Sequence, residues 1–541
     1  MSYVVGISSG AFAAAPQQEK IRYVTLSRKA LASITEGVNF VQIDLESIAE
    51  FKEPDLMENI KNVKKLGITF GIHGESVAFG GREVPTHLDS AIEDEYRRSH
   101  ERLLEALEHA GKIGSKYYLL HASETVPFII LGTSLQPTSL VDWWGRPLSK
   151  LLEEDEELWE WAVKQDFILE PGRGVRLRSL EEWKRIARDE MLEEWVREFL
   201  MRERRNPTEE EIRRKEEEIR PEVERRAINY AKRSLRDYIE TRDLAYGAER
   251  IAYYIVAKWM EKHNDPLWIN ITGGGSMDDK DFREGENYQK WVPAVAAKYL
   301  WGHFNQDKCP DPEYRKKDPK EILKKYGMYF VIESGMPPGG MEGLLRLCNP
   351  LHFHYLAKEV GLDYLRICID PEHVMMNNLD PEKVIDSLPE DGGKSVLVLH
   401  LGWPTTAGSP VHMPVFLASE QQVYLYKLLY KLRQKGFTCK EEDGYLVFEK
   451  GPFGPKETIV VLRKIVEFLE KDVPPDKLPL EFFGIATGEM ISEERQLAAI
   501  REHAFDPLKG LLMVPEEEYG IFGAAAAEKG KAEVWKKEKY K

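Results

Sequence analysis

The chain has 541 residues, with 92 acidic and 76 basic side chains and a net charge of -16. A chain of this length holds several domains or one large domain with insertions. Lys, Glu and Arg interrupt every apolar stretch, so none reaches the ~18 residues that a membrane-spanning helix needs. The acidic balance argues against a protein that relies on broad neutralisation of nucleic-acid phosphates, although a local basic patch remains compatible with it.

The amino terminus and the cysteines indicate the compartment. Residues 1–6 contain no basic segment and lead directly into a strand pattern, so we expect no secretory signal and a cytoplasmic location. Cys309, Cys348, Cys368 and Cys439 form no CxxC pair. This spacing predicts reduced thiols and excludes a cysteine-ligated zinc ribbon. Abundant Glu, Lys and Arg with few Gln favours a thermophilic source as a hypothesis.

Eight short apolar runs predict strands, and helical patterns lie between them. The predicted strands are residues 3–7, 38–45, 68–72, 117–120, 328–332, 365–369, 395–399 and 480–483. The clearest predicted helix covers residues 90–113. Strands that alternate with helices of this length predict a parallel sheet with crossover helices. Eight of them predict an α/β protein with an eight-stranded parallel (β/α) TIM barrel.

A long segment interrupts this alternation. We expect the first half of the barrel at 1–125, a charged helical insertion after the fourth strand at 126–319, the second half at 320–504 and a C-terminal extension at 505–541. Within the insertion, Thr208 and Glu211 predict a capping box that begins a helix. Asp443 and Gly444 predict a small hairpin insertion between the seventh and eighth strands, at about 437–450.

The insertion contains ten of the 12 tryptophans and several arginine clusters. The arginines could contact a phosphate backbone while exposed tryptophans stack on bases. We favour a different interpretation, in which Glu and Arg pair on solvent-facing helix surfaces and the tryptophans form a core. Because the insertion follows the fourth strand, it leaves from the catalytic face, and we expect it to cap the pocket and restrict the substrate.

Polar residues follow consecutive predicted strands. They are His73, His121, Glu333, Asp370 with His373, and His400; His412 on the loop after the seventh strand and Glu481 in the eighth extend the set. The carboxyl ends of barrel strands meet at one face, so these side chains are expected to converge. One such histidine is more often a core residue than a ligand, but five together favour a metal site. Imidazole and carboxylate groups suit Zn, Mn or Fe, and a bridging carboxylate can hold two ions.

Three motifs carry a family resemblance. They are Arg97-Arg98-Ser99 leading to His121, Glu333-Ser334-Gly335 with Gly339-Gly340, and Asp370-Pro371-Glu372-His373. Together they resemble the xylose-isomerase-like TIM barrel superfamily (AP endonuclease family 2), and within it the endonuclease IV group of abasic-site nucleases. The resemblance covers about 300 residues at both ends of the chain and leaves the insertion unmatched.

The resemblance implies a metal-dependent hydrolase with two zinc ions and possible room for a third, with Mn or Fe as alternatives. His73, His121 and Glu333 would hold one ion. Glu333 would bridge to a second ion held by Asp370, His400 and Glu481, and His373 and His412 would belong to a third. A metal-bridging hydroxide would attack a phosphodiester of abasic DNA or of a smaller phosphoester, with Glu333, Glu481 and His373 as the catalytic residues.

Two departures from the family pattern concern these ligands. The family carries Asp two residues before the histidine after its seventh strand, whereas Pro410 precedes His412, so the third ion lacks a ligand. The family's last glutamate lies four residues after a proline, whereas Glu481 lies two residues after Pro479. The position of the last ligand is therefore the least determined.

Two other functions remain open. A sugar or polyol isomerase or epimerase of the same superfamily would use one metal, a glutamate acid/base pair and His373 in contact with the substrate. His73 and His121 would then have no role. A barrel without catalysis, whose insertion is an interaction module, is the third possibility. The sequence does not identify the substrate, the metal or the oligomeric state.

Overall fold

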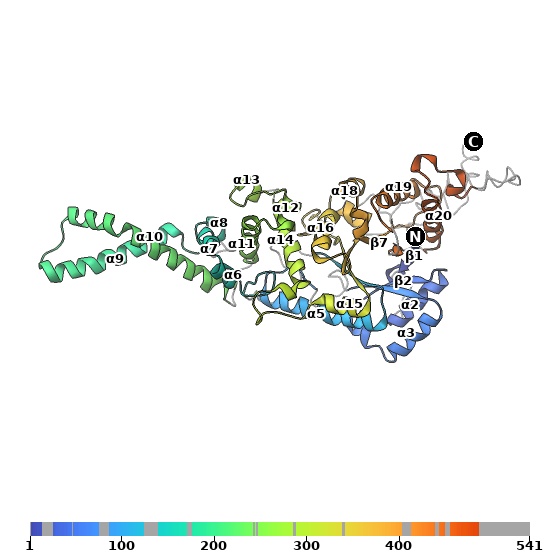
Figure 1. Cartoon of the computed structure of the whole chain (residues 1–541), viewed down its shortest axis with the longest axis horizontal. Coiled ribbons are helices and arrows are strands. Elements are labelled where there is room, and N and C mark those ends of the chain that lie inside the picture. The colour runs from blue at the N-terminus through green and yellow to red at the C-terminus, as the bar shows by residue number, and fades with distance from the viewer. Residues whose placement is uncertain are drawn as a thin grey trace, which may run out of the picture.

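The computed structural model describes residues 2–12, 25–45, 47–74, 86–123, 139–169, 176–241, 244, 247–284, 288–337, 341–402, 413–438, 443–449 and 455–485. Within them, eight parallel strands form a closed barrel in sequential order, on the right of Figure 1. The strands are β1 (Ser2–Ser8), β2 (Phe40–Asp44), β3 (Thr69–His73), β4 (Tyr117–His121), β5 (Tyr329–Glu333), β6 (Leu365–Ile369), β7 (Val396–His400) and β8 (Asp443–Phe448). The predicted TIM barrel is confirmed.

The eighth strand lies elsewhere than predicted. Residues 443–448 pair in parallel with both β1 and β7 and close the barrel, so the predicted hairpin at 437–450 is wrong. The predicted eighth strand forms instead the short 3-10 helix η8 (Leu480–Phe483). Its Leu480 is 53% exposed and only Phe482 is buried, whereas a barrel strand is covered on both faces.

Helices surround the barrel on its outer side. They are α2 (Leu26–Thr35), α3 (Leu56–Lys65), α5 (Glu93–Ile113), α15 (Pro319–Tyr326), α16 (Pro350–Val360), α17 (Pro371–Met376), α18 (Pro381–Ser387), α19 (Glu420–Gln434) and α20 (Lys456–Glu470). The predicted helix at 90–113 is α5. It buries Leu103, Leu107 and Ala110 on one face at helical spacing, and it ends at Gly114 with φ of 76°.

Alternate residues of the strands point into the barrel and fill it in layers. The first layer is aromatic, with the Phe40 ring 4.5 Å from Tyr445 and 6.0 Å from Tyr117 between ring centroids. Gly71 makes room for Tyr117, since a Cβ atom there would lie 2.3 Å from that ring. The next layer holds Gln42, Leu119, Val331, Cys368, Val398 and Val447, all buried. The interior is therefore a packed core, and its carboxyl end carries the site.

Between β4 and α15 the chain forms a separate group of helices. They are α6 (Leu148–Glu154), α7 (Glu156–Val163), α8 (Asp166–Leu169), α9 (Leu180–Glu203), α10 (Glu209–Ile239), α11 (Glu249–Lys262), α12 (Pro266–Thr272), α13 (Lys280–Arg283) and α14 (Tyr288–His303). Helices α9 and α10 form a long hairpin that projects away from the barrel, on the left of Figure 1. The Thr208 and Glu211 capping box is present at the start of α10.

The charged and aromatic residues of these helices follow the favoured interpretation. Arg205 pairs with Glu211 at 2.7 Å, and Arg225 and Arg226 both pair with Glu222. None of the ten tryptophans is exposed, and Trp143, Trp159, Trp268 and Trp291 are buried. These arginines thus lie in ion pairs with glutamates of α10, and the indoles pack inside. The hairpin points away from the barrel, so α9 and α10 do not form the expected cap over the pocket.

The described residues also bear on the expectations about membrane-spanning helices and about the cysteines. No helix among the described residues is long and apolar enough to cross a membrane. Cys309, Cys348 and Cys368 are free and buried, as expected for reduced thiols, while Cys439 lies outside the described residues. The expected extension at 505–541 also lies outside them. The domain boundaries stay a prediction.

Candidate metal centre

Seven strands place an ionisable side chain at the carboxyl end of the barrel. They are Asp44 on β2, His73 on β3, His121 on β4, Glu333 on β5, Asp370 directly after β6, His400 on β7 and Glu449 directly after β8. Each lies an even number of residues from an inward-pointing core residue of the same strand, so it faces the barrel axis. Five of the predicted ligands are therefore brought together, and two further carboxylates join them.

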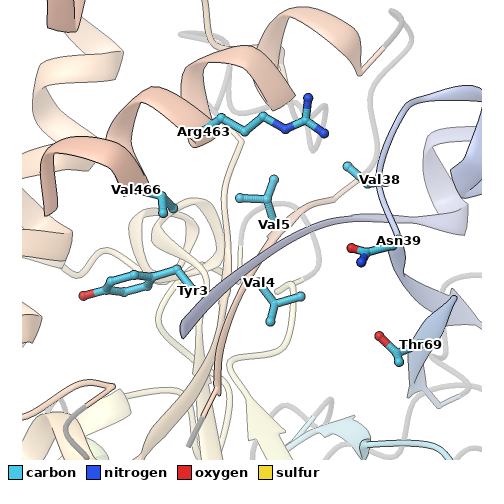
Figure 2. A pocket seen from close by; sticks show the side chains of 8 residues that line it. All are labelled: Tyr3, Val4, Val5, Val38, Asn39, Thr69, Arg463 and Val466. Carbon is cyan, nitrogen blue, oxygen red and sulfur yellow. The ribbon is translucent and has the colours of Figure 1, made fainter. Parts of the chain in front are cut away.

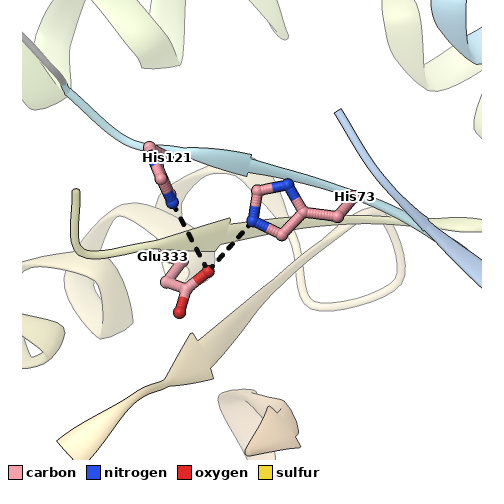
Figure 3. A group of neighbouring side chains, drawn as sticks. All are labelled: His73, His121 and Glu333. Carbon is pink, nitrogen blue, oxygen red and sulfur yellow. Dashed lines mark ion pairs between the residues drawn. The ribbon is translucent and has the colours of Figure 1, made fainter. Parts of the chain in front are cut away.

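The first group, which we call the histidine half-site, consists of His73, His121 and Glu333 (Figure 3). Glu333 Oε2 lies 3.6 Å from His73 Nε2 and 3.9 Å from His121 Nε2. The two imidazoles meet edge to face, with ring centroids 5.2 Å apart. His73 Nδ1 donates to the Gly74 carbonyl at 2.8 Å, so Nε2 is the nitrogen presented to Glu333.

The second group, the carboxylate half-site, consists of Glu333, Asp370, His400 and Glu449, all buried. His400 Nδ1 lies 2.7 Å from Glu333 Oε1, 3.0 Å from Glu449 Oε2 and 3.7 Å from Asp370 Oδ2. Asp370 Oδ1 accepts from the backbone N–H groups of Glu372 and His373, as the N-cap of α17, which fixes the carboxylate at the strand end. Glu333 belongs to both half-sites, through different oxygens.

The carboxylate that the eighth strand brings to this group is Glu449 and not Glu481. Glu481 lies in η8 and not in a barrel strand, so its predicted position at the end of the eighth strand is wrong, and its predicted roles as metal ligand and catalytic residue have no support from the geometry. The sequence contains a signal for Glu449, because residues 445–448 are apolar and Glu449 follows them, as Glu333 follows residues 329–332. The turn signal at Asp443 and Gly444 concealed it.

His373 lies beside both half-sites. Its Nδ1 contacts the Ser334 carbonyl at 3.0 Å, Glu333 Oε1 at 3.4 Å and Asp370 Oδ2 at 3.9 Å. Its ring lies 5.6 Å from that of His121, in an edge-to-face arrangement. His412, the other predicted ligand of a third ion, lies outside the described residues, as does Pro410. The structure therefore places one residue of that predicted group at the site.

The carboxylates and imidazoles shift one another's protonation. Burial alone would raise the pKa of Glu333, but His400 and hydrogen bonds from His373, His400 and His73 lower it well below its ordinary value. Burial alone would lower the pKa of His400, yet Cys368, Glu333 and Glu449 raise it well above that of a free imidazole. For His373, Asp370 and Glu333 outweigh burial and raise the pKa to about 10. The group therefore holds concentrated negative charge that favours cations.

The donors fit divalent metal ions. His73 Nε2 and Glu333 Oε2 are buried and make no hydrogen bond shorter than 3.5 Å within the described part of the chain, although they lie 3.6 Å apart and Glu333 Oε2 lies 3.9 Å from His121 Nε2. Imidazole nitrogens with carboxylate oxygens suit Zn, Mn or Fe. Cys368 also lies within reach of Glu333 and His400, at the floor of the carboxylate half-site.

A cavity of about 400 Å³ lies at the opposite end of the barrel (Figure 2). Its lining residues come from the beginnings of β1, β2 and β3 and from α20: Tyr3, Val4, Val5, Val38, Asn39, Thr69, Arg463 and Val466. It contains no pair of carboxylates and no imidazole. In TIM barrels catalysis takes place at the carboxyl ends of the strands, so we assign the chemistry to the two half-sites.

Comparisons with known proteins return only distant structures. No family model matches the chain, and no curated protein matches it. Similar solved structures include an L-ribulose 3-epimerase (11% identity, TM-score 0.36, covering 96% of this chain and 100% of that one). A D-tagatose 3-epimerase-like protein (10%, 0.38, 88% and 100%) and 3-keto-D-glucoside 4-epimerase from E. coli (10%, 0.36, 86% and 99%) are others.

The activities of these three structures correspond to the sugar-epimerase alternative and not to the endonuclease IV group. At identities and TM-scores this low, the similarity carries no conclusion about the substrate of this chain. The barrel itself is established by the strand pairing. The choice between hydrolase and epimerase chemistry therefore depends on the geometry of the half-sites.

Proposed function

We propose that this chain is a divalent-metal-dependent enzyme that hydrolyses phosphoesters at the carboxyl end of its barrel. One observation carries the proposal: Glu333 presents Oε2 to the histidine half-site and Oε1 to the carboxylate half-site. A carboxylate shared in this way is the usual bridge of a two-metal centre. A one-metal enzyme has no use for two imidazoles, those of His73 and His121, within 4 Å of that carboxylate.

Each half-site would bind one of the two ions. His73, His121 and Glu333 would hold one ion, and Glu333, Asp370, His400 and Glu449 the other. Two such ions supply Lewis-acid polarisation of a phosphoryl group and activation of water. The Nδ1 of His373 lies 3.0 Å from the Ser334 carbonyl, beside both half-sites, so this imidazole is placed to contact a substrate bound there.

The first test is a count of metals and a substrate panel. Protein purified without chelators is analysed for Zn, Mn and Fe, and about two ions per chain are expected. Hydrolysis is then measured on bis-p-nitrophenyl phosphate, on an abasic-site duplex and on single-stranded abasic DNA. Less than one ion per chain after metal reconstitution, or two ions without hydrolysis of any phosphoester, contradicts the proposal.

Epimerisation of ketoses is the second candidate, favoured by one observation. The carboxylate half-site has four buried donors and is complete without His73 and His121. Glu333 and Glu449 lie 2.7 and 3.0 Å from His400 Nδ1 and could serve as the two proton-transfer carboxylates.

A double variant, His73→Ala with His121→Ala, separates the two candidates. If the protein is a two-metal hydrolase, the double variant should bind one ion fewer and lose most of its rate of hydrolysis, because half of the metal centre is missing. An epimerase keeps its single ion and its exchange of the C3 proton of a ketose into deuterated water. Retention of one ion together with C3 exchange in both wild type and variant would assign the chain to the second candidate.

A further inference from the structure

Two polar residues lie inside the barrel directly beneath the carboxylate half-site. Gln42 is fully buried in β2, and its Oε1 lies 2.9 Å from His400 Nε2. The Tyr117 hydroxyl, on β4, donates to the same oxygen at 3.0 Å. Buried amides in an otherwise apolar layer are costly unless they are fully hydrogen-bonded. The position of Gln42 therefore calls for a function that Leu or Val would not fulfil.

Asp44 determines which way the Gln42 amide faces. Gln42 Nε2 lies 3.4 Å from Asp44 Oδ1, two residues further along the same face of β2. An ionised carboxylate only accepts hydrogen bonds, so it must face the amide NH2 group. With the amide reversed, Oε1 would face a carboxylate oxygen of Asp44, and two acceptors cannot share a hydrogen bond. The carbonyl oxygen of Gln42 is thus directed at His400.

This orientation selects the nitrogen that His400 offers to a metal. A carbonyl oxygen accepts only from a protonated Nε2, which leaves the lone pair of neutral His400 on Nδ1. Nδ1 is the atom that faces Glu333, Asp370 and Glu449. We propose that Gln42, oriented by Asp44 and Tyr117, is a positioning residue that holds His400 in the tautomer that binds metal through Nδ1. The proposal deepens the proposed function and rests on it.

Titrating metal into Gln42 variants tests the proposal. Zn2+ binding is measured by competition with a chelating dye, in wild type, Gln42→Leu and Gln42→Glu. Gln42→Leu should weaken one of the two sites by about 10- to 100-fold, the usual effect of losing the group that orients a ligating histidine. The other site, built on His73 and His121, serves as an internal control and should keep its affinity. Leu119→Met, in the same layer, controls for altered packing.

Gln42→Glu distinguishes positioning from a structural role. A carboxylate accepts the same Nε2 proton, so this variant should bind the second ion more tightly than Gln42→Leu does, even though its other oxygen faces the Asp44 carboxylate. A merely structural glutamine would give the opposite order, because a buried charge destabilises the barrel more than leucine does. Equal losses in both variants, or no loss in Gln42→Leu, would overturn the inference while the metal count of the wild type still supports the proposed function.

A measurement on wild type keeps the test independent of folding in the variants. In protein labelled with 15N at histidine and loaded with Zn2+, the His400 signals, identified by their absence from His400→Gln, should show the proton on Nε2. A proton on Nδ1 overturns the inference. Wild-type protein that binds no metal at all overturns both this inference and the proposed function.

Discussion

Glu333 occupies the position on which both half-sites depend. It is fully buried, and its two oxygens face different groups of ligands. Neighbouring imidazoles lower its pKa well below the ordinary value, which favours its ionised form. Removing the residue would leave several histidines facing an empty position, so its loss affects both half-sites together.

A matched pair of glutamates tests the assignment of the last ligand. Glu449→Gln should reduce affinity for the second ion by about 10-fold or more, because a neutral amide replaces an anionic ligand at 3.0 Å from His400 Nδ1. Glu481→Gln, the same change outside the barrel, should leave both ions bound. Metal titration measures both. If Glu481→Gln loses metal while Glu449→Gln keeps both ions, the last ligand is Glu481 and the assignment of Glu449 is contradicted.

The protonation of His373 predicts how the stability of the metal-free protein depends on pH. Its pKa is raised from 6.5 to about 10, so the stabilisation is complete below pH 6.5 and is lost as the pH rises towards 10. The loss should be on the order of a few kcal/mol. Urea unfolding in the presence of a chelator, at pH 6.5 and pH 9.5, measures it. His373→Asn should show a smaller decline over this interval, and an equal decline in both proteins would contradict the prediction.

At the scale of elements, the sequence predicted seven of the eight strands and failed at one. The seven are apolar runs followed by a polar residue, and alternation with helices determines their role. Residues 443–448 carry the same pattern, but Asp443 and Gly444 are also typical of a hairpin. Whether such a turn joins antiparallel neighbours depends on partners far along the chain, here β1 and β7. No local signal contains that information.

The residues of the site also differ in whether the local sequence pattern predicts them. His73, His121, Glu333, Asp370 and His400 stand at strand ends and were predicted from that position. Gln42 was not, since it lies inside a strand where an apolar residue is expected, and its role depends on a hydrogen bond to a residue 358 positions away. Ligands follow from local pattern, whereas the residues that orient them follow from three-dimensional contact.

A buried ion pair links the inserted helices to the barrel. Arg346, in the loop after β5, and Glu249, on α11, are both almost fully buried and pair through two hydrogen bonds. Glu249 also accepts from the Ala91 backbone N–H at 2.8 Å, just before α5. The pair therefore holds three segments together.

Glu249→Ala should destabilise the protein by about 3–5 kcal/mol, because it leaves the Arg346 charge buried without its partner. Urea-induced unfolding measures the change. Asp94→Ala, which breaks the exposed pair with Arg97, is the control and should cost at most about 1 kcal/mol. Similar effects of the two substitutions would show that the linkage does not depend on the buried pair.

Seen as a whole, the molecule joins a packed barrel to a thin, charged projection. Among its described residues, the distal part of the α9 and α10 hairpin buries Phe199 and a small cluster of Ala187, Ile219 and Val223 that is separate from the main core. Nearer the body, Ala231, Leu235 and Ile239 join that main core. The projection therefore adds little to the stability of the barrel.

Replacing residues 192–220 by a short glycine–serine turn tests this separation. The shortened protein should bind as many metal ions as wild type and unfold at nearly the same temperature, because every ligand and the main core remain. Calorimetry and metal analysis provide the measurements. A decrease of the unfolding temperature by more than about 4 °C, which corresponds to about 4 kcal/mol for a chain of this size, would show that the distal hairpin supports the barrel.

Because the inserted helices lie between them in the sequence, the candidate ligands are synthesised at different times. His73 and His121 precede them and Glu333 follows, about 210 residues after His121. At roughly 5–20 residues per second, a ribosome needs about 10 to 40 s to pass from one to the other. The nascent chain thus exposes two histidines well before the carboxylate that must join them exists. In the proposed two-metal centre, the carboxylate half-site also needs Glu449, so the second ion could bind only after β8 has been synthesised.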